Sequence, residues 1–225
     1  YPIDKYYLIE DSCNNKVYEK IKNNTLFKDF ICFFNTEKKW QIDSIDFIYE
    51  KINTECIFHC EDDWVFYRWN FIEDSLTLLE LDKNIFQVRL RKIQSTNHKI
   101  EKKEYSFQWI KYFKLWTQID KNWNKHNWFS FNPWIKRLND YKKIWGKYKN
   151  IWHEWELSVW NYNNNMYSVI LENDAVKHIG AWHHLIDPNV TKPSIYRSIR
   201  NLLINFLFKI KVWFLISKII QKYKK

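Results

Sequence analysis

Short apolar runs and helix-spaced apolar residues alternate along the first ninety positions of the chain. Each apolar run has the length of a buried strand, and the segments between the runs repeat with a helical period. The predicted strands are 6–9, 29–34, 56–59 and 85–90, and the predicted helices are 14–24, 42–52 and 72–79. Strands that alternate with helices form βαβ units. The pattern therefore predicts an α/β fold with a mixed, mostly parallel central sheet flanked by helices.

The second half of the chain has a less regular pattern. Residues 95–135 are crowded with Trp, Phe, Tyr and Lys and have little periodicity, which indicates long loops and short strands lining a site. Asn132-Pro133 predicts a turn, followed by a helix that runs through Lys143. Beyond it we expect a helix at 154–163, a strand at 167–171 and a loop beginning at His178.

A basic, aromatic tail, residues 193–225, follows the predicted domain, residues 1–192. Its longest charge-free stretch is Asn201–Phe208, far short of the roughly 20 residues that span a bilayer. One interpretation is an amphipathic helix whose lysines meet anionic headgroups, which gives a peripheral contact with a membrane surface. The other is a terminal helix that packs on the domain or on a second subunit.

Composition narrows the classes of function. The chain has 225 residues, of which 46% are hydrophobic and 28% charged, as in folded proteins. It contains two glycines, too few for a dinucleotide-binding fingerprint or a Walker loop. The formal net charge of +10 favours an anionic partner: nucleic acid, acidic lipid or a phosphorylated small molecule. Because two glycines cannot form a glycine-rich phosphate loop, any phosphate must be bound by a metal ion or by side chains.

The four cysteines predict no disulfide framework and no zinc site. Their spacing contains no C-x-x-C pair, and Cys56 and Cys60 flank an apolar run. We expect reduced, buried thiols, which are typical of a reducing compartment such as the cytoplasm.

Three consecutive carboxylates, Glu61, Asp62 and Asp63, directly follow the predicted strand 56–59. Ligands of open α/β sheets bind beyond the carboxyl ends of the strands. Clustered carboxylates repel one another unless a cation lies among them, and Mg²⁺ or Mn²⁺ suits such oxygen ligands together with a diphosphate. The cluster therefore predicts a metal site, and a solvated acidic loop or a helix N-terminus is the simpler alternative.

A resemblance to a known family starts from this cluster. The stretches IFHCEDDWVF, FIEDSLTLLELDKNIFQVRLR, FSFNPW and VKHIGAWHH occur in this order. Together they resemble family 2-type glycosyltransferases of the GT-A fold, and the likeness covers roughly residues 5–190. The resemblance implies a GT-A type nucleotide-diphospho-sugar transferase fold. It also implies transfer of a hexose-type sugar from a UDP- or GDP-sugar to a hydroxyl of a glycan, lipid or protein acceptor, with inversion.

The resemblance also assigns roles to individual residues. Mn²⁺ or Mg²⁺ would bind at an acidic triplet, with Asp63, Glu61 and His178 as the metal ligands. Asp11 and the triplet residues Glu61 and Asp62 would contact the nucleotide-sugar donor. The catalytic base would be Glu154, with Glu156 as the second choice. The family normally has an aspartate at position 61 and an acid at position 153, where this chain has Glu61 and His153.

Further side chains have two open interpretations. Arg89 and Arg91 are two residues apart on one predicted strand, so both point the same way, either toward a donor phosphate or toward solvent. Four tryptophans could stack on sugar faces or pack in the core: Trp109, Trp116, Trp123 and Trp128. His183 and His184 could join His178 or lie on the surface.

Two other functions compete with sugar transfer. A non-catalytic carbohydrate-binding or degenerate transferase domain would keep the fold and the aromatic residues without turnover. A nucleic-acid binder would use the net charge and the interleaved aromatics. Because the basic residues concentrate in the tail and the acids at strand ends, we expect no nucleic-acid partner.

Overall fold

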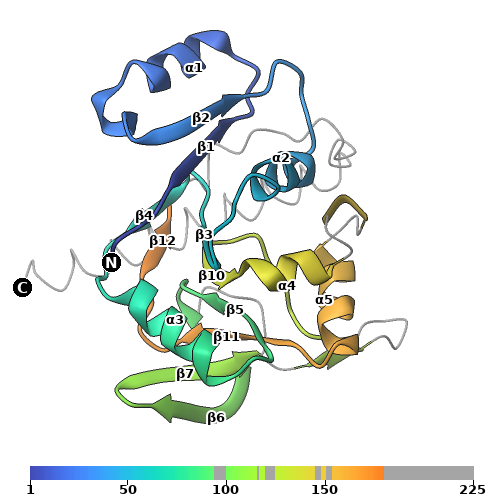
Figure 1. Ribbon diagram of the computed structural model, residues 1–225. Helices are drawn as coiled ribbons and strands as arrows, with labels where there is room; N and C mark the ends of the chain where they lie inside the picture. Colours follow the sequence, from blue (N-terminus) through green and yellow to red (C-terminus); the bar gives the residue numbers. More distant parts are fainter. Residues whose placement is uncertain (94–99, 116, 120–124, 145–147, 151–153, 180–225) are drawn as a thin grey trace, which may run out of the picture. The chain divides into compact units, whose positions relative to one another are not determined.

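The N-terminal residues form a βαβ unit, as the sequence predicts. Strands β1 (Tyr6–Glu10) and β2 (Phe30–Phe34) are parallel, with Tyr6 opposite Phe30, and helix α1 (Asn15–Lys22) connects them (Figure 1). The side chain of Asn14 accepts a hydrogen bond from the backbone N–H of Lys16 and caps α1. A short 3₁₀ turn, Thr25–Phe27, precedes β2.

The computed structural model describes residues 1–93, 100–115, 117–119, 125–144, 148–150 and 154–179. All of them belong to one compact unit that extends to His184. The predicted tail, 193–225, and the side chains of Trp116, Trp123, His153, His183 and His184 lie outside the described residues.

The main sheet has six strands in the order β3-β10-β5-β11-β7-β6. Their bounds are β3 Cys56–His59, β10 Trp134–Arg137, β5 Ile85–Arg89, β11 Tyr167–Leu171, β7 Ile110–Leu115 and β6 Ile100–Phe107. Strand β10 is antiparallel to both β3 and β5, whereas β5 and β11 are parallel. The hairpin of β6 and β7 forms the edge farthest from β3 (Figure 1).

The α/β class is therefore confirmed, but the prediction of a mostly parallel sheet was wrong. The predicted helix after Pro133 begins only at Leu138, because Trp134–Arg137 form strand β10 in the middle of the sheet. The segment 95–135, for which we expected long loops and short strands, supplies the longer β6–β7 hairpin. Four of the five strand pairs in this sheet are antiparallel, and β5–β11 is the parallel one.

Two small sheets complete the strands. Strands β4 (Trp64–Phe66) and β12 (Val176–His178) pair in antiparallel fashion, and so do β8 (Gln118–Ile119) and β9 (Lys125–His126). His178 thus lies in a strand instead of beginning a loop.

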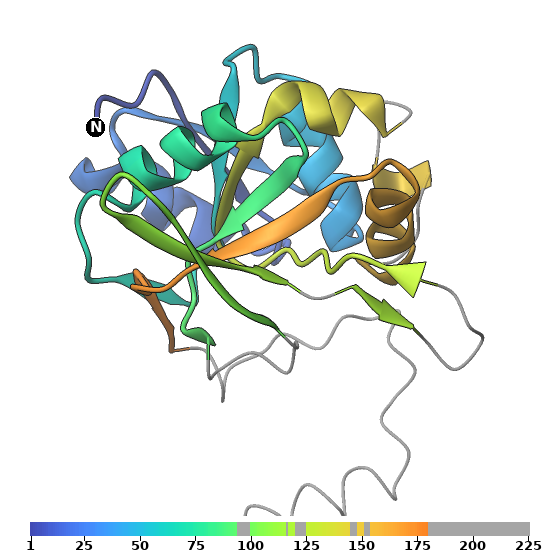
Figure 2. The same cartoon turned by 90° about the horizontal axis from the view of Figure 1, so that it is seen from below.

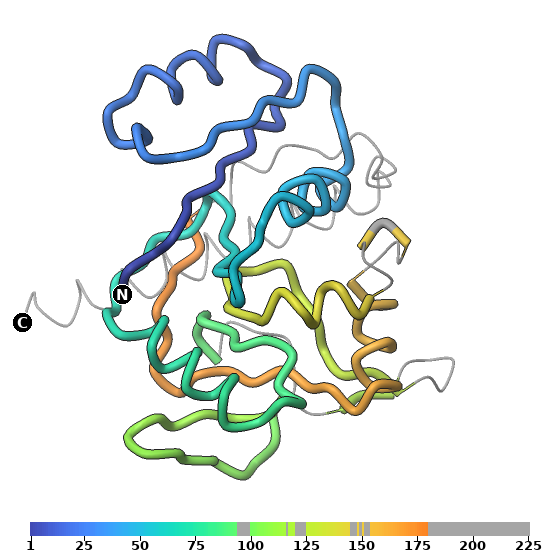
Figure 3. Tube along the Cα trace, in the orientation of Figure 1, coloured from blue at the N-terminus to red at the C-terminus, as the bar shows by residue number. Residues whose placement is uncertain are grey.

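Helices pack on the main sheet and on one of the small sheets. Helix α3 packs on β5 and β10, as Figure 2 shows, and helix α5 packs against β9. The remaining bounds are α2 Gln41–Tyr49, α3 Phe71–Leu81, α4 Leu138–Lys143, α5 Glu154–Asn163 and the 3₁₀ turn Tyr148–Asn150. The first residue lies beside the start of α3 (Figure 3). The amino group of Tyr1 is 3.6 Å from a carboxylate oxygen of Glu73 in that helix.

A buried polar group stands out in the larger apolar cluster. Lys136 of β10 is fully buried, and its Nζ lies 4.4 Å from the ring centre of Tyr148 and 4.7 Å from that of Trp134. Nearby, Asp46 of α2 is buried and accepts hydrogen bonds from the hydroxyl of Tyr141 and the backbone N–H of Tyr148, each at 2.8 Å. These contacts tie α2 to the segment that follows β10.

The four cysteines are free, as expected, although their burial was predicted incorrectly. Cys60 is exposed, and Cys13, Cys32 and Cys56 are only partly buried. Within the described part of the chain, no helix is both long enough and apolar enough to cross a bilayer.

Candidate functional site

The strand directions bring three separate segments to one edge of the main sheet. Since β10 runs opposite to β3 and β5, its first residue lies beside their last ones: Trp134 pairs with His59 and with Arg89. The turn after β3, the end of β5 and the loop before β10 therefore meet at this edge. It is the edge beyond the carboxyl ends of β3 and β5, where the acidic triplet follows β3.

Asp63 and His178 are 115 positions apart in sequence and are in direct contact. Strand β12 pairs with β4 so that His178 lies opposite Trp64. The Nε2 atom of His178 is 2.8 Å from Oδ2 of Asp63, and the backbone N–H of Ile179 donates to the carbonyl oxygen of Asp63 at 2.8 Å. The second carboxylate oxygen of Asp63, Oδ1, is buried and has no hydrogen-bond partner among the described residues. The contact with His178 therefore holds the Asp63 carboxylate in place through Oδ2, while Oδ1 has no hydrogen-bond partner among the described residues.

Glu61 lies beside this pair and is held by two donors. The side-chain amide of Gln41, at the start of α2, donates to Oε1, and the indole N–H of Trp64 donates to Oε2 at 3.4 Å. Burial raises the pKa of the Glu61 carboxyl, and the negative charges of Asp63 and Glu154 raise it further. A cation placed among these groups would relieve the repulsion between them.

Glu154 begins helix α5 and faces the loop before β10. Its Oε1 atom accepts a hydrogen bond of 2.6 Å from the backbone N–H of Phe131. The side chain is otherwise exposed, and its charge acts on both Glu61 and Arg89. Glu156 is two positions along the same helix, and such residues do not share a helix face. The structure therefore brings Glu154, and not Glu156, to the acidic cluster.

Two arginines lie at the end of β5 and just after it. Arg89 is buried, and this burial together with the neighbouring charge of Arg91 lowers its pKa to about 10. Arg91 donates to Oδ1 of Asn132 at 2.9 Å, and its guanidinium carbon is 5.5 Å from the ring centre of Trp64. Burial also lowers the pKa of Arg91. Arg91 thus reaches the ring that stands beside His178, within the same cluster as the acids.

The remaining predicted donor contacts are less central. Asp62 is exposed in the turn after β3. Asp11 follows β1, and its carbonyl oxygen accepts a hydrogen bond from Nζ of Lys38 at 3.4 Å. Within the described residues, neither a hydrogen bond nor an ion pair joins Asp11 to Glu61, Asp63 or His178.

Three residues of the site had no role in the sequence-based assignment. Trp64 and Asn132 stand within the EDDW and FSFNPW stretches, so those motifs carried a signal for them. Gln41 had no such signal, because its contact with Glu61 depends on how α2 packs.

Two of the four tryptophans considered as sugar-stacking residues lie in the described part of the chain. Trp109 is exposed on the turn of the β6–β7 hairpin, and Trp128 is partly buried.

The residues present fit a divalent ion only together with a substrate. Among the described residues, no group of three or more His, Cys, Asp or Glu side chains is arranged to hold a metal ion by itself. The unpartnered oxygen of Asp63 and the adjacent imidazole of His178 offer two ligands. Mg²⁺ is commonly bound by one or two carboxylates while substrate phosphates complete its coordination.

No protein-family model matches the chain, and a search of curated proteins finds no match to it.

Proposed function

We propose that this protein is a metal-dependent glycosyltransferase of the GT-A type, which transfers a hexose-type sugar from a nucleotide-sugar donor to a hydroxyl acceptor. The observation that supports it most is the contact between Asp63 and His178 beside Glu61. These residue types come from the EDDW and HIG stretches that carry the family resemblance. Their meeting beyond the carboxyl end of a strand supports a metal site for a diphosphate, because ligands of open α/β sheets bind there and carboxylates suit the ion.

Asp63 and His178 would hold Mn²⁺ or Mg²⁺ in this proposal. The ion supplies positive charge where the departing nucleoside diphosphate becomes negative. Arg91 adds a second cation at the same edge, and its hydrogen bond to Asn132 fixes the position of its guanidinium. The buried Arg89 contributes further positive charge near Glu154.

Glu154 is the proposed general base. The acceptor hydroxyl gives its proton to the Glu154 carboxylate while its oxygen forms a bond to the anomeric carbon. The bond between that carbon and the diphosphate oxygen breaks, and the nucleoside diphosphate leaves with the bonding electrons. Attack from the opposite side inverts the anomeric centre. The hydrogen bond from the N–H of Phe131 orients the carboxylate for this role.

Thermal unfolding in the presence of nucleotide sugars tests the proposal. With UDP-glucose, UDP-N-acetylglucosamine or GDP-mannose, we expect a rise in Tm only when MnCl₂ is also present. A ligand at 100 times its Kd adds about 2.7 kcal/mol, which corresponds to roughly 5–10 °C for a chain of this size.

The same samples distinguish an enzyme from a binding domain. Release of UDP or GDP, followed with a coupled assay, supports transfer or donor hydrolysis. Donor binding without any release supports the non-catalytic alternative. The absence of a Mn²⁺-dependent shift with all three donors contradicts the proposal.

Substituting Glu154 tests the assignment of the base. Glu154→Gln keeps an oxygen that can accept from the Phe131 N–H but removes the proton acceptor, so we expect turnover to fall about 10²–10⁴-fold. Donor affinity, measured by the thermal shift, should remain. Glu156→Gln is the matched variant, and its turnover should change less than about threefold. Equal losses in both variants would contradict the assignment.

A further inference from the structure

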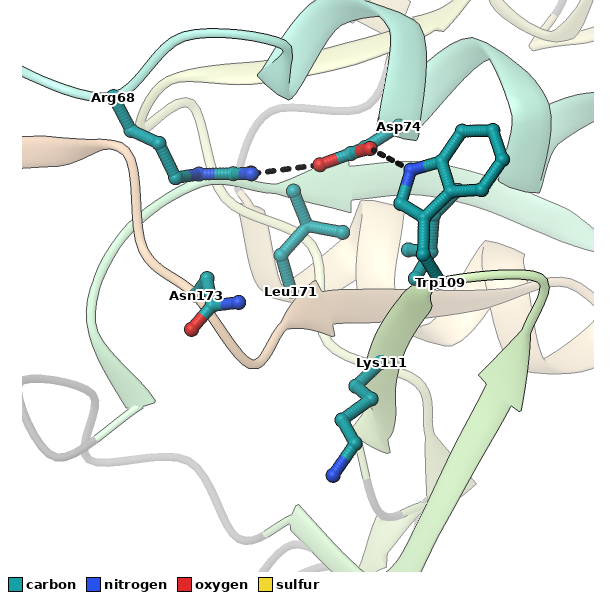
Figure 4. A pocket seen from close by; sticks show the side chains of 7 residues that line it. Arg68, Asp74, Trp109, Lys111, Leu171 and Asn173 are labelled. Carbon is teal, nitrogen blue, oxygen red and sulfur yellow. Dashed lines mark hydrogen bonds and ion pairs between the residues drawn. The ribbon is translucent and has the colours of Figure 1, made fainter.

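A polar pocket lies beside helix α3 and the β6–β7 hairpin, and none of the residues of the acidic cluster lines it. It has a volume of about 80 Å³ and is lined by Arg68, Asp74, Trp109, Ile110, Lys111, Leu171 and Asn173 (Figure 4). We name it the Trp109 pocket. Leu171 is buried, whereas four of the lining side chains are polar or charged. No residue of the proposed transfer site lines it.

The indole of Trp109 is both exposed and fixed in place. It is 76% exposed at the turn of the hairpin, yet its N–H donates to Oδ1 of Asp74 at 3.3 Å. The other oxygen of Asp74 accepts a 2.7 Å hydrogen bond from Arg68 (Figure 4). A large aromatic ring held in one orientation, with its surface open to solvent, is a preorganised stacking surface.

Polar groups surround this ring. Asp74 is buried, and the Nε and Nη2 atoms of Arg68 are buried without a hydrogen-bond partner among the described residues. The amide of Asn173 lies on the opposite side of the pocket from Trp109 in Figure 4. An apolar base, an aromatic wall and several hydrogen-bonding groups match the two chemical surfaces of a pyranose, its C–H face and its hydroxyl edge.

The charge balance favours a neutral ligand over an anion. Arg68 is paired with Asp74 at 2.7 Å, and Lys111 is paired with Glu104 at 3.1 Å. Glu172 also acts on Lys111. Because acids match the two cations, the pocket has no excess of positive charge to attract a phosphate or a uronate.

The pocket is connected to the proposed transfer site by the β4–β12 ribbon. Asp63 and His178 lie at one end of this ribbon, and Arg68 and Asn173 lie just beyond its other end. Asp63 and Arg68 are five positions apart in sequence, so their Cα atoms are at most about 18 Å apart. A chain of several sugars could therefore reach both.

We propose that the Trp109 pocket binds a neutral sugar residue of a glycan acceptor. The role of acceptor rests on the proposed transferase function, whereas sugar binding by the pocket does not. A ligand held here would position a neighbouring sugar at the transfer site and would favour oligosaccharides over monosaccharides as acceptors.

Saturation-transfer NMR with the full chain, without donor and with EDTA, tests the binding. The probes are neutral hexose and N-acetylhexosamine oligosaccharides, matched uronate oligosaccharides and inorganic phosphate. We expect at least one neutral oligosaccharide to bind, and Trp109→Ala to weaken it about tenfold through loss of stacking. Trp69→Ala is the control, because Trp69 is 88% exposed on the loop before α3 and does not line the pocket. The affinity of Trp69→Ala for the same oligosaccharide should change less than about twofold.

The outcomes separate this inference from the proposed function. Absence of binding by every neutral probe, equal binding by Trp109→Ala, or preferential binding of phosphate or uronates would overturn the pocket assignment. Binding that depends on Trp109 in a chain that never consumes a nucleotide sugar would keep the pocket and remove its acceptor role.

Discussion

Asp63→Asn is expected to abolish Mn²⁺-dependent stabilisation by donor and to lower sugar transfer by about 10²–10³-fold. The wild-type carboxylate has one oxygen next to Nε2 of His178 and one that is buried without a partner among the described residues. Asparagine has the same shape and keeps an oxygen that can face His178. It lacks the negative charge that binds the cation, so the fold should persist while the metal-dependent step fails.

The measurements are Mn²⁺-dependent thermal shift and release of nucleoside diphosphate. Asp62→Asn is the matched control, because Asp62 is the exposed neighbour in the same turn, and its effect on turnover should stay below about tenfold. The Tm of both variants without ligand should lie within about 4 °C of the wild type, the size expected for a change near 1 kcal/mol. Retention of Mn²⁺-dependent turnover by Asp63→Asn would remove the metal assignment.

The elements that the sequence predicts best are those whose periodicity and burial agree. Strands 56–59 and 167–171 and helix 154–163 have the predicted bounds. In each case a run of consecutive apolar residues or a helical period is bounded by polar residues. Such local patterns indicate the type of an element without reference to its tertiary contacts.

The errors arise where tertiary structure overrides a local signal. Strand β10 begins directly after Pro133 and contains two charged residues, Lys136 and Arg137. A proline followed by charged residues resembles the polar start of a helix. It becomes a strand because β3 and β5 both offer it hydrogen bonds. The β6–β7 hairpin lacks a glycine at its turn, where Gln108 has a φ of 52°, so no turn motif marked it.

Part of the candidate site could be predicted from the sequence, and the rest depended on tertiary packing. Asp63, His178 and Glu154 could be chosen by their motifs, and the structure brings them to one cluster through the β4–β12 pairing and the start of α5. The anchoring of Glu61 by Gln41 could not be foreseen, because it depends on the packing of α2. Asp11 was selected by the same type of motif, and its interactions with a donor stay a prediction.

The largest expected effect on stability concerns Lys136. Its ammonium lies among six aromatic rings, with the centroids of Tyr148, Trp134 and Phe86 at 4.4, 4.7 and 4.9 Å, and it has no hydrogen-bond partner among the described residues. Cation–π contacts offset part of the cost of removing a charge from water. Burial nevertheless lowers the pKa of Lys136 well below its ordinary value of 10.5, against the opposing effect of Asp140 and Asp46.

Lys136→Met is therefore expected to raise the free energy of unfolding at pH 7 by about 1–4 kcal/mol. Methionine has a similar length, and its sulfur packs well against aromatic rings. Urea denaturation measures the change. Lys142→Met, an exposed position on the adjacent helix, is the control and should change stability by less than about 0.5 kcal/mol. A loss of stability in Lys136→Met would mean that the amine makes a specific bond in the native protein.

The pH dependence of this difference gives an independent check. Since the pKa of Lys136 is lower in the folded protein than in the unfolded chain, the unfolded chain binds more protons between the two values. The contribution of Lys136 to stability therefore improves as pH rises toward the unfolded pKa and worsens as pH falls. The advantage of Lys136→Met should shrink steadily when urea denaturation is repeated between pH 7 and pH 9.5. A constant difference across that range would show that the amine keeps its proton in the core, with the aromatic rings and nearby acids compensating for its burial.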